Sequence, residues 1–223
     1  AWRRGLHRPI VALTWSGATD DVALLWYIVK RGGTTMRTLA PLFSSYTATS
    51  GLRGATNYTF TVTAVDAAGN STTSSSVSAT TSGPVNGSTY EILSNGQCLD
   101  VNGGSTSSGS SVIGWSCHDG DNQMWIVNYL SDGTFQLTPK HAPSLRLGSS
   151  ASATGSSLQV LTNPGTNARW IASFASDGTA TLTNADTGLC LGTNDSWAGP
   201  AVHLQTCSAA SAQRVTLSAA AVA

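Results

Sequence analysis

Charge is scarce in this chain of 223 residues. Charged residues make up 10% of it, against about 25% in an average soluble protein. The 11 basic and 11 acidic residues cancel, and Lys30 and Lys140 are the two lysines. A basic face that binds nucleic acid is therefore not expected. A coiled coil is not expected either, because it needs charged side chains beside its apolar seam.

Long hydrophobic runs are missing as well. No stretch approaches the roughly 20 consecutive apolar residues of a membrane-spanning helix, so we expect no membrane partner. Apolar residues still reach 40% at zero net charge, which argues against disorder. The 23 glycines, together with many serines, threonines and valines, favour short strands joined by turns. We predict an all-β fold.

The four cysteines all lie after residue 97, at Cys98, Cys117, Cys190 and Cys207. They form no C-x-x-C pair, so we predict no metal site, and we expect no cofactor. Four cysteines allow three disulfide connectivities, and the separations of 19 and 17 residues favour Cys98–Cys117 and Cys190–Cys207. Disulfides would imply export to an oxidising compartment. The alternative is four reduced, buried cysteines in a cytosolic protein.

A polar stretch divides the chain near residue 83. Residues 71–82 are rich in serine and threonine, with one candidate edge strand from Ser75 to Thr80. The following Gly-Pro-Val-Asn-Gly at 83–87 is typical of a linker. We predict a first domain over residues 1–82, a linker over 83–88 and a second domain over 89–223.

The first domain shows the two-residue alternation of half-buried strands. In the segment 58–65, Tyr58, Phe60, Val62 and Ala64 share one face, and threonines occupy the other. Segments 11–15 and 26–30 also have strand patterns, and turn sequences follow at 31–33 and 66–70. Short strands at these intervals predict a β-sandwich.

These segments resemble a fibronectin type III domain over residues 9–82. The sequences "LTW" at 13–15, "NYTFTVTAVDAAGN" at 57–70 and "SVSATT" at 76–81 are similar to its strands B, F and G, and residues 18–32 to strands B and C. Leu52 and Tyr58 are similar to the tyrosine corner of such domains. Residues 1–10 depart from the first strand of that family. The resemblance implies a spacer, with adhesion or ligand binding as the alternative.

The second domain contains a threefold repeat. The sequence at 131–138, "SDGTFQLT", recurs at 176–183 as "SDGTATLT", 45 residues later. Trp125, Trp170 and Val215 follow the same interval, while Leu99, Leu145 and Leu191 are spaced by 46. Each copy is too short to bury its own apolar face, so three copies are expected to share one core.

The first copy carries a recognisable set of motifs. It contains "CLDV" at 98–101, "WSC" at 115–117 and "NQMW" at 122–125. This set strongly resembles the ricin B-type lectin repeat, which is also the pattern of family 13 carbohydrate-binding modules, with Gln123 to Trp125 as the Q-x-W signature. The resemblance implies a β-trefoil of three four-stranded repeats. It also implies a polysaccharide or a galactose- or xylose-type sugar as the ligand.

The resemblance assigns a sugar site to the first repeat. A carboxylate or amide can bond two sugar hydroxyls, and an aromatic ring packs on the C–H face of the sugar. Ile113 stands where some family members have a polar residue. The alternative interpretation gives Asp100 a turn role and places Trp115 in the core. The five assigned residues are Asp100 as the hydroxyl bridge, Trp115 as the stacking ring, His118 at the pocket wall, Asn122 as the amide, and Gln123 as a support for Asp100.

The other two repeats have lost this set. In the second, our alignment places Arg146 at the aspartate position, Leu161 at the tryptophan position, and Ser144 and Asn163 at the cysteine positions. In the third, Gly192 replaces the aspartate, Gln205 the tryptophan, and the triplet becomes Gln213-Arg214-Val215. We predict one competent site, with a dissociation constant on the order of 0.1–1 mM.

Catalysis in this chain is not expected. A glycosidase usually needs two carboxylates, yet Glu91 is the lone glutamate, and Asp119 and Asp121 lie on a glycine-flanked loop. Serine-elbow and zinc-protease motifs are absent. We predict a secreted, monomeric, non-catalytic region that targets a glycoside hydrolase to polysaccharide, with the catalytic part preceding residue 1. Alternatives are a free-standing lectin or toxin-binding subunit, and an interaction trefoil without a sugar site.

Overall fold

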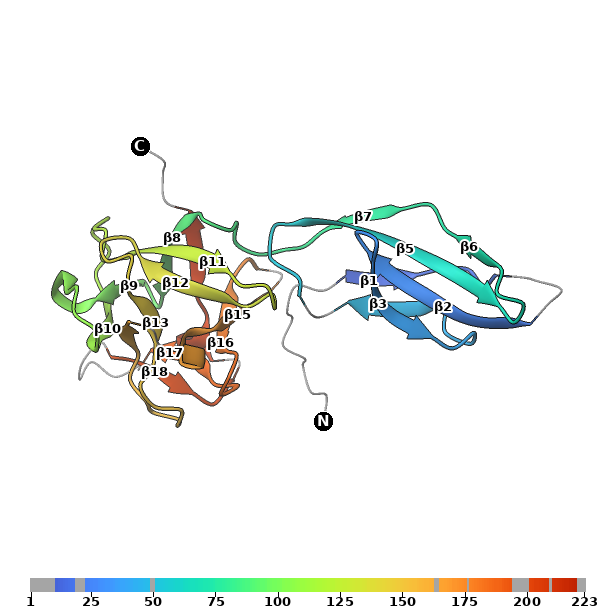
Figure 1. Cartoon of the computed structure of the whole chain (residues 1–223). Helices are drawn as coiled ribbons and strands as arrows, with labels where there is room; N and C mark the ends of the chain where they lie inside the picture. The colour runs from blue at the N-terminus through green and yellow to red at the C-terminus, as the bar shows by residue number, and fades with distance from the viewer. Residues whose placement is uncertain are drawn as a thin grey trace. The chain divides into compact units, whose positions relative to one another are not determined.

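The computed structural model describes residues 11–18, 23–48, 51–162, 165–175, 177–193, 201–208 and 210–219, without the side chains of 165 and 166. The predicted departure at residues 1–10, the end of the strand B motif at 19–22, and Asn163 lie outside these residues. The chain divides into two compact units after Ser82 (Figure 1). Every element longer than a single 3₁₀ turn is a strand, so the all-β prediction is confirmed for the described part.

The first unit has two antiparallel sheets. One pairs β1 with β4, and the other has the order β3-β2-β5-β6, with β7 also paired to β5. Strands β3, β4 and β6 have no counterpart in the sequence prediction, and β7 begins two residues later than predicted. The bounds are β1 (Val11–Thr14), β2 (Leu24–Arg31), β3 (Thr34–Leu39), β4 (Ser45–Ala48), β5 (Asn57–Asp66), β6 (Ser71–Thr73) and β7 (Val77–Thr80).

Both sheets contribute to one core. Val11 and Leu13 of the small sheet pack in a cluster with Val29 and Phe60 of the large sheet. The alternation in β1 therefore places its apolar face inward, as predicted. The Tyr58 hydroxyl accepts a hydrogen bond from the Arg53 backbone N–H at 2.8 Å, and this bond ties the start of β5 to the segment before it.

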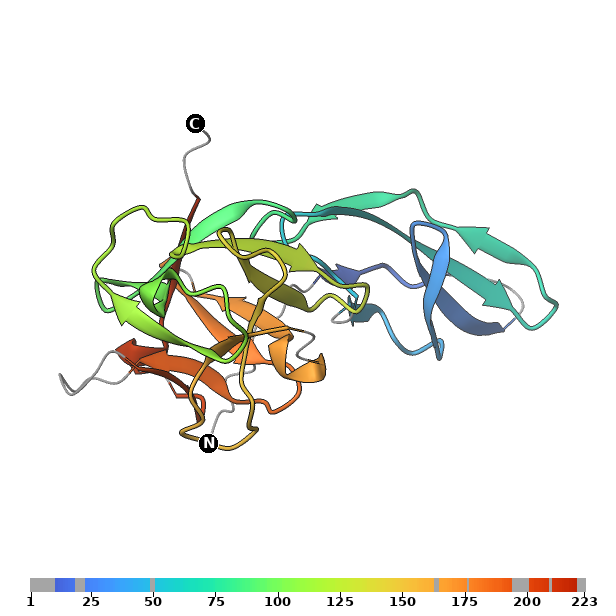
Figure 2. The same cartoon turned by 60° about the vertical axis from the view of Figure 1, so that its left-hand side comes forward.

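The second unit consists of three four-strand repeats. In each repeat the outer two strands belong to a barrel and the inner two form a hairpin; their course can be followed by colour in Figure 2. The repeats are β8 (Thr89–Ser94), β9 (Gln97–Val101), β10 (Ser110–Trp115) and β11 (Met124–Tyr129); β12 (Phe135–Pro139), β13 (Arg146–Gly148), β14 (Gln159–Leu161) and β15 (Trp170–Phe174); β16 (Ala180–Asn184), β17 (Cys190–Thr193), β18 (Val202–Gln205) and β19 (Thr216–Ala219). Short 3₁₀ turns lie at η1 (Asn102–Gly104), η2 (Gly165–Ala168) and η3 (Ser211–Gln213).

The core repeats with the interval found in the sequence. Tyr90 pairs with Trp125 between β8 and β11, and Phe135 pairs with Trp170 between β12 and β15. The third equivalent bridge joins Ala180 to Val215. The partners on each side are 45 residues apart, and all six are buried in one cluster. The three copies therefore bury their apolar faces against one another, as expected.

Two buried indoles anchor hairpins to the barrel. Trp125 Nε1 donates to the Leu99 carbonyl at 2.8 Å, and Trp170 Nε1 donates to the Leu147 carbonyl at 3.0 Å. Leu147, rather than Leu145, is therefore the counterpart of Leu99. The pairing of strands agrees, because Arg146 lies opposite Leu161 as Cys98 lies opposite Trp115.

The alignment of the second repeat in the sequence analysis was consequently wrong. Arg146 occupies the position of Cys98, where Ser144 had been placed, and Gly148 occupies the position of Asp100. The segment that leads into this hairpin is two residues longer than the assumed spacing of 46. A sequence signal for this was present, since "LRLG" at 145–148 matches "LCLG" at 189–192.

Disulfides close two of the three hairpins. Cys98 is bonded to Cys117, and Cys190 to Cys207, so the favoured local pairing is the one in the structure. In both cases the first cysteine lies in one hairpin strand and the second follows its partner strand by two residues. Closing loops of this size contributes about 3 kcal/mol each in the chain-entropy account.

Residues 85–88 of the predicted linker are bonded to the second unit. The Gly87 N–H donates to the Val127 carbonyl at 2.7 Å, and the Val127 N–H donates back to the Ser88 carbonyl at 3.0 Å. The Asn86 side-chain oxygen accepts from the Tyr129 N–H at 2.7 Å. This segment therefore extends β8 along β11.

Two aspartate turns are repeated 45 residues apart. Asp132 Oδ1 accepts from the Thr134 N–H and hydroxyl, and Asp177 Oδ1 accepts from the same groups of Thr179. Each aspartate also pairs through Oδ2 with an arginine 37 residues later, Arg169 or Arg214. Burial raises the pKa of Asp132, but the bonds from Thr134 and Arg169 outweigh it and the pKa lies below its usual value. The hydrogen bonds of Thr179 lower the pKa of Asp177.

These turns predict that the free energy of unfolding falls as the pH is lowered into the acid range. A carboxyl whose pKa is lower in the folded state stabilises the fold above its unfolded value of about 3.9, and this contribution is lost as pH falls through the folded pKa. We expect the double variant Asp132→Asn/Asp177→Asn to lose less stability than wild type below about pH 4. Urea midpoints between pH 6 and pH 2 measure this. Asp119→Asn, at a carboxylate without a partner in the described residues, is the control and should keep the wild-type slope.

Candidate functional site

An open hollow of about 450 Å³ lies beside the β9–β10 hairpin. Four of the five residues assigned from the sequence line it, and the fifth, Gln123, is fully buried behind Asp100. The structure therefore brings the whole predicted set together. The lining residues are Asp100, Asn102, Gly103, Gly104, Ile113, Trp115, His118 and Asn122.

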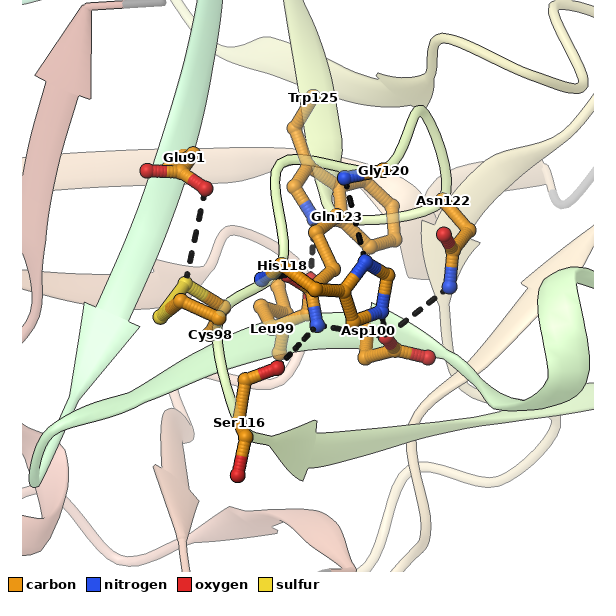
Figure 3. Close-up of a disulfide and its surroundings, with 11 residues drawn as sticks. Glu91, Cys98, Leu99, Asp100, Ser116, His118, Gly120, Asn122, Gln123 and Trp125 are labelled. Atoms are coloured by element: carbon orange, nitrogen blue, oxygen red, sulfur yellow. Dashed lines mark hydrogen bonds and ion pairs between the residues drawn. A yellow bond between two sulfur atoms is a disulfide. The ribbon is translucent and has the colours of Figure 1, made fainter.

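Three side-chain nitrogens lie close to one oxygen of Asp100 (Figure 3). Oδ2 accepts hydrogen bonds from Gln123 Nε2 at 2.7 Å and from Asn122 Nδ2 at 2.9 Å, and His118 Nε2 lies 3.3 Å away. The other oxygen, Oδ1, has no hydrogen-bond partner in the described part of the chain. Asp100 is 3% exposed, so the two amides hold a nearly buried carboxylate in place and leave Oδ1 unengaged within these residues.

The Gln123 amide is bonded on both sides. Its Oε1 accepts from the His118 backbone N–H at 2.9 Å, and its Nε2 donates to the Ser116 carbonyl at 3.0 Å as well as to Asp100. The amide therefore fixes the chain that leaves β10 and the carboxylate on β9 at the same time. The amide thus contacts Asp100, as expected from the sequence, and it also holds the chain at the end of the hairpin.

Trp115 provides an apolar surface at the rim. It ends β10, lies opposite Cys98 and is 52% exposed, so it does not belong to the core. Ile113, opposite Asp100 on the same strand, is half-buried and lines the hollow. An exposed indole beside a fixed carboxylate is the combination that binds a ring with one apolar face and several hydroxyls.

A 3₁₀ turn forms another part of the wall. Asn102, Gly103 and Gly104 make this turn after β9, and both glycines have left-handed φ values, 63° and 60°. No side chain from Gly103 or Gly104 narrows the hollow. These three residues were not among those assigned from the sequence, although Asn-Gly-Gly is a turn signature that could have located them.

The equivalent places in the other repeats are occupied differently. Gly148 and Gly192 stand where Asp100 does in the first repeat. The Arg146 guanidinium is bonded to the carbonyls of Pro143 and Leu145, so it stabilises its own hairpin. Gln213 keeps the structural bonds of Gln123, with Oε1 accepting from Ser208 N–H and Nε2 donating to the Thr206 carbonyl.

Comparison with known proteins now decides the family. Residues 88–215 match the ricin-type beta-trefoil lectin domain. The chain belongs to this family. The β-trefoil that the ricin B-type resemblance implied for the second domain is thereby confirmed.

The relatives among curated proteins are much longer than this chain. Exoglucanase A of Cellulomonas fimi is 35% identical over 159 residues, which is 64% of this chain and 18% of that protein. Chitinase D of Niallia circulans is 45% identical over 73 residues, 32% of this chain and 13% of that protein. The chain therefore spans less than a fifth of the length of these relatives.

Solved structures show the same fold. The designed threefold-symmetric protein ThreeFoil is 28% identical, with a TM-score of 0.56, and covers 58% of this chain and 97% of its own. A Macrolepiota procera ricin B-like lectin in complex with lactose is 22% identical, with a TM-score of 0.54, and covers 62% and 100%. An exo-beta-1,3-galactanase from Clostridium thermocellum is 14% identical, with a TM-score of 0.56, and covers 95% and 45%.

Within the described residues, none of the helices is long and apolar enough to cross a membrane. In the same residues, no group of three or more histidine, cysteine, aspartate or glutamate side chains is arranged to hold a metal ion.

The structure predicts similar losses of stability, but different changes in hydrogen exchange, when the equivalent glutamines Gln123 and Gln213 are replaced. Gln123→Leu and Gln213→Leu each remove buried hydrogen bonds, so each should lower the free energy of unfolding by about 1–3 kcal/mol in urea titrations. We expect Gln123→Leu alone to speed hydrogen exchange at the His118 amide, because that N–H loses its acceptor. Unchanged exchange at His118 in Gln123→Leu would contradict this assignment.

Proposed function

We propose that this chain is a non-catalytic carbohydrate-binding region with one sugar site, in the first repeat. One observation carries the proposal: two amides fix Asp100 through Oδ2 with His118 Nε2 beside them, and Asp100, whose Oδ1 has no partner among the described residues, lines a hollow together with the exposed Trp115 ring. Oδ1 accepts a hydrogen bond from a sugar hydroxyl, and the indole packs on the C–H face. His118 and Asn122 complete the wall as hydrogen-bonding groups.

The charge of the site favours a neutral ligand. Among the described residues, Asp100 is the one carboxylate in the lining, and no lysine or arginine of that part of the chain lines it. Lys140, the nearest lysine in sequence, is paired with Asp121 at 2.8 Å. We propose a galactose- or xylose-type sugar or a polysaccharide built from one; the lactose complex of the Macrolepiota procera lectin supports the same class.

The geometry argues against catalysis at this hollow. A glycosidase needs a second carboxyl across the bond that breaks, whereas Asp121 is engaged by Lys140 on an exposed loop and Glu91 contacts the Cys98 sulfur. We propose that the chain binds sugar and leaves the chemistry to another domain. An exoglucanase and chitinases among its relatives support the role of targeting a glycoside hydrolase to polysaccharide.

We propose that the first unit is a fibronectin type III spacer. Its small sheet, β1 with β4, corresponds to strands B and E, and the order β3-β2-β5 with β6 and β7 corresponds to C′, C, F and G. The bond from the Arg53 N–H to the Tyr58 hydroxyl has the form of a tyrosine corner. The two disulfides support secretion, and a monomer agrees with a single working site.

A free-standing lectin or toxin-binding subunit is the second candidate. One observation favours it: the Macrolepiota procera lectin is matched over 100% of its own length by this β-trefoil. Reading the coding frame on both sides of this chain separates the candidates, because a targeting region requires a hydrolase domain in the same frame.

Removing the indole tests the apolar contact. Trp115→Ala should weaken sugar binding about tenfold or more, while changing the free energy of unfolding by about 0.5 kcal/mol or less, since the ring is exposed. Isothermal titration with galactose, xylo-oligosaccharides and β-glucans measures the affinity. Leu161→Ala, at the equivalent position of the second repeat, is the matched control and should bind as wild type does.

Removing the carboxylate tests the polar contact. Asp100→Ala should abolish measurable binding in the same titrations, because both the hydroxyl acceptor and the anchor for Asn122 are lost. Circular dichroism and thermal unfolding confirm that the variant is folded. If Asp100→Ala binds every ligand as tightly as wild type, the site has been assigned wrongly.

A further inference from the structure

Gly120 lies in the loop that connects His118 to Asn122, two of the proposed sugar contacts. Its backbone N–H donates to His118 Nδ1 at 3.2 Å (Figure 3). Asp119, between them, has a left-handed φ of 57°, a conformation that aspartate tolerates better than most residues. This tight turn brings the Gly120 N–H back onto the imidazole ring.

The bond to Gly120 determines which ring nitrogen of neutral His118 carries the proton. A nitrogen that accepts an N–H bond carries no proton of its own, so the proton of neutral His118 must be on Nε2. Nε2 is the atom that lies 3.3 Å from Asp100 Oδ2. The Gly120 N–H therefore turns the donor side of the imidazole towards the carboxylate.

The absence of a side chain at Gly120 leaves room for the side chains of His118 and Asn122. A Cβ atom there would lie 2.6 Å from His118 Cε1 and 2.7 Å from Asn122 Oδ1, both closer than real Cβ contacts occur. The φ of Gly120 lies outside the left-handed region, so an alanine would meet no backbone strain. The atoms in the way belong to an exposed and a half-buried side chain, which can move without unfolding the loop.

We propose that Gly120 is a positioning residue of the sugar site, which holds His118 as the Nε2–H tautomer and leaves room for the Asn122 amide. The inference rests on the proposed function, since it concerns the same site. Gly120 itself contacts no ligand. It acts through the side chains of His118 and Asn122, which are proposed to contact the sugar. A methyl group added at Gly120 displaces both side chains, while the β-trefoil stays folded.

Gly114→Ala is the matched control. Gly114 lies in the same repeat, also has a φ outside the left-handed region, and its Cβ would lie 2.7 Å from Oε1 of the exposed Gln97. The local crowding is therefore similar, but Gln97 does not line the hollow.

The test has two readouts on the whole chain. Imidazole ¹⁵N shifts, measured without ligand, should show the Nε2–H tautomer of His118 in wild type and in Gly114→Ala, and its loss in Gly120→Ala. Titration with the sugar that wild type binds should show about a tenfold or greater loss of affinity for Gly120→Ala, as expected when two polar contacts are displaced, and little change for Gly114→Ala.

The two hypotheses fail in different ways. If wild type binds no sugar, the proposed function fails, and the ligand-free ¹⁵N shifts still decide whether Gly120 positions His118. Sugar binding by Gly120→Ala equal to that of wild type overturns the positioning role and leaves the proposed function standing. An Nδ1–H tautomer in wild type, or unfolding of Gly120→Ala at a temperature where Gly114→Ala is folded, also overturns it.

Discussion

The buried amide of Gln123 is the interaction on which the first repeat depends. Its oxygen accepts a hydrogen bond from the chain that follows β10, at the His118 N–H. Its nitrogen donates to the Ser116 carbonyl and to the buried carboxylate of Asp100 on β9. An unpaired buried amide or carboxylate there would cost about 1–3 kcal/mol, against a net gain of about 1 kcal/mol for a satisfied hydrogen bond. The stability of the hairpin and the orientation of the carboxylate in the proposed sugar site therefore depend on the same side chain, and the disulfide beside it limits how far the loop can move.

The rest of the β-trefoil shows that this amide can serve structure alone. Gln213 makes the same two backbone bonds in the third repeat, where a glycine replaces the aspartate. The second repeat has neither a disulfide nor a glutamine at this point, yet its Trp170 is anchored to the Leu147 carbonyl as Trp125 is to Leu99. The three repeats thus share the core and differ in how their hairpins are secured.

The three repeats and their shared core could be predicted from the sequence, because the interval of 45 residues is a property of the core. Residues that must meet in a threefold barrel recur at that interval, as Trp125 and Trp170 do. Hairpin lengths are not constrained in this way, and the assumed spacing therefore misplaced Arg146 by two residues. Strands β3 and β6 were missed for another reason: threonine- and serine-rich edge strands lack the apolar alternation that marks a buried face.

The site was predictable in its residue types but not in its geometry. Motif order gave Asp100, Trp115, His118, Asn122 and Gln123, and the hollow contains or backs onto all five. Which oxygen of Asp100 is engaged depends on where the side chains of Asn122, Gln123 and His118 lie in space. The turn at Asn102–Gly104 and the crowding at Gly120 depend on backbone angles and on contacts between nearby side chains, neither of which a residue pattern specifies.

The glycines at the Asp100 position of the other repeats determine where a second carboxylate could be introduced by design. A Cβ at Gly192 would lie 2.5 Å from Oε1 at the end of the flexible Gln205 side chain, whereas a Cβ at Gly148 would lie 3.0 Å from the Asn167 backbone oxygen. A carboxylate in the third repeat therefore requires only that one side chain moves, while the second repeat would also require a shift of backbone.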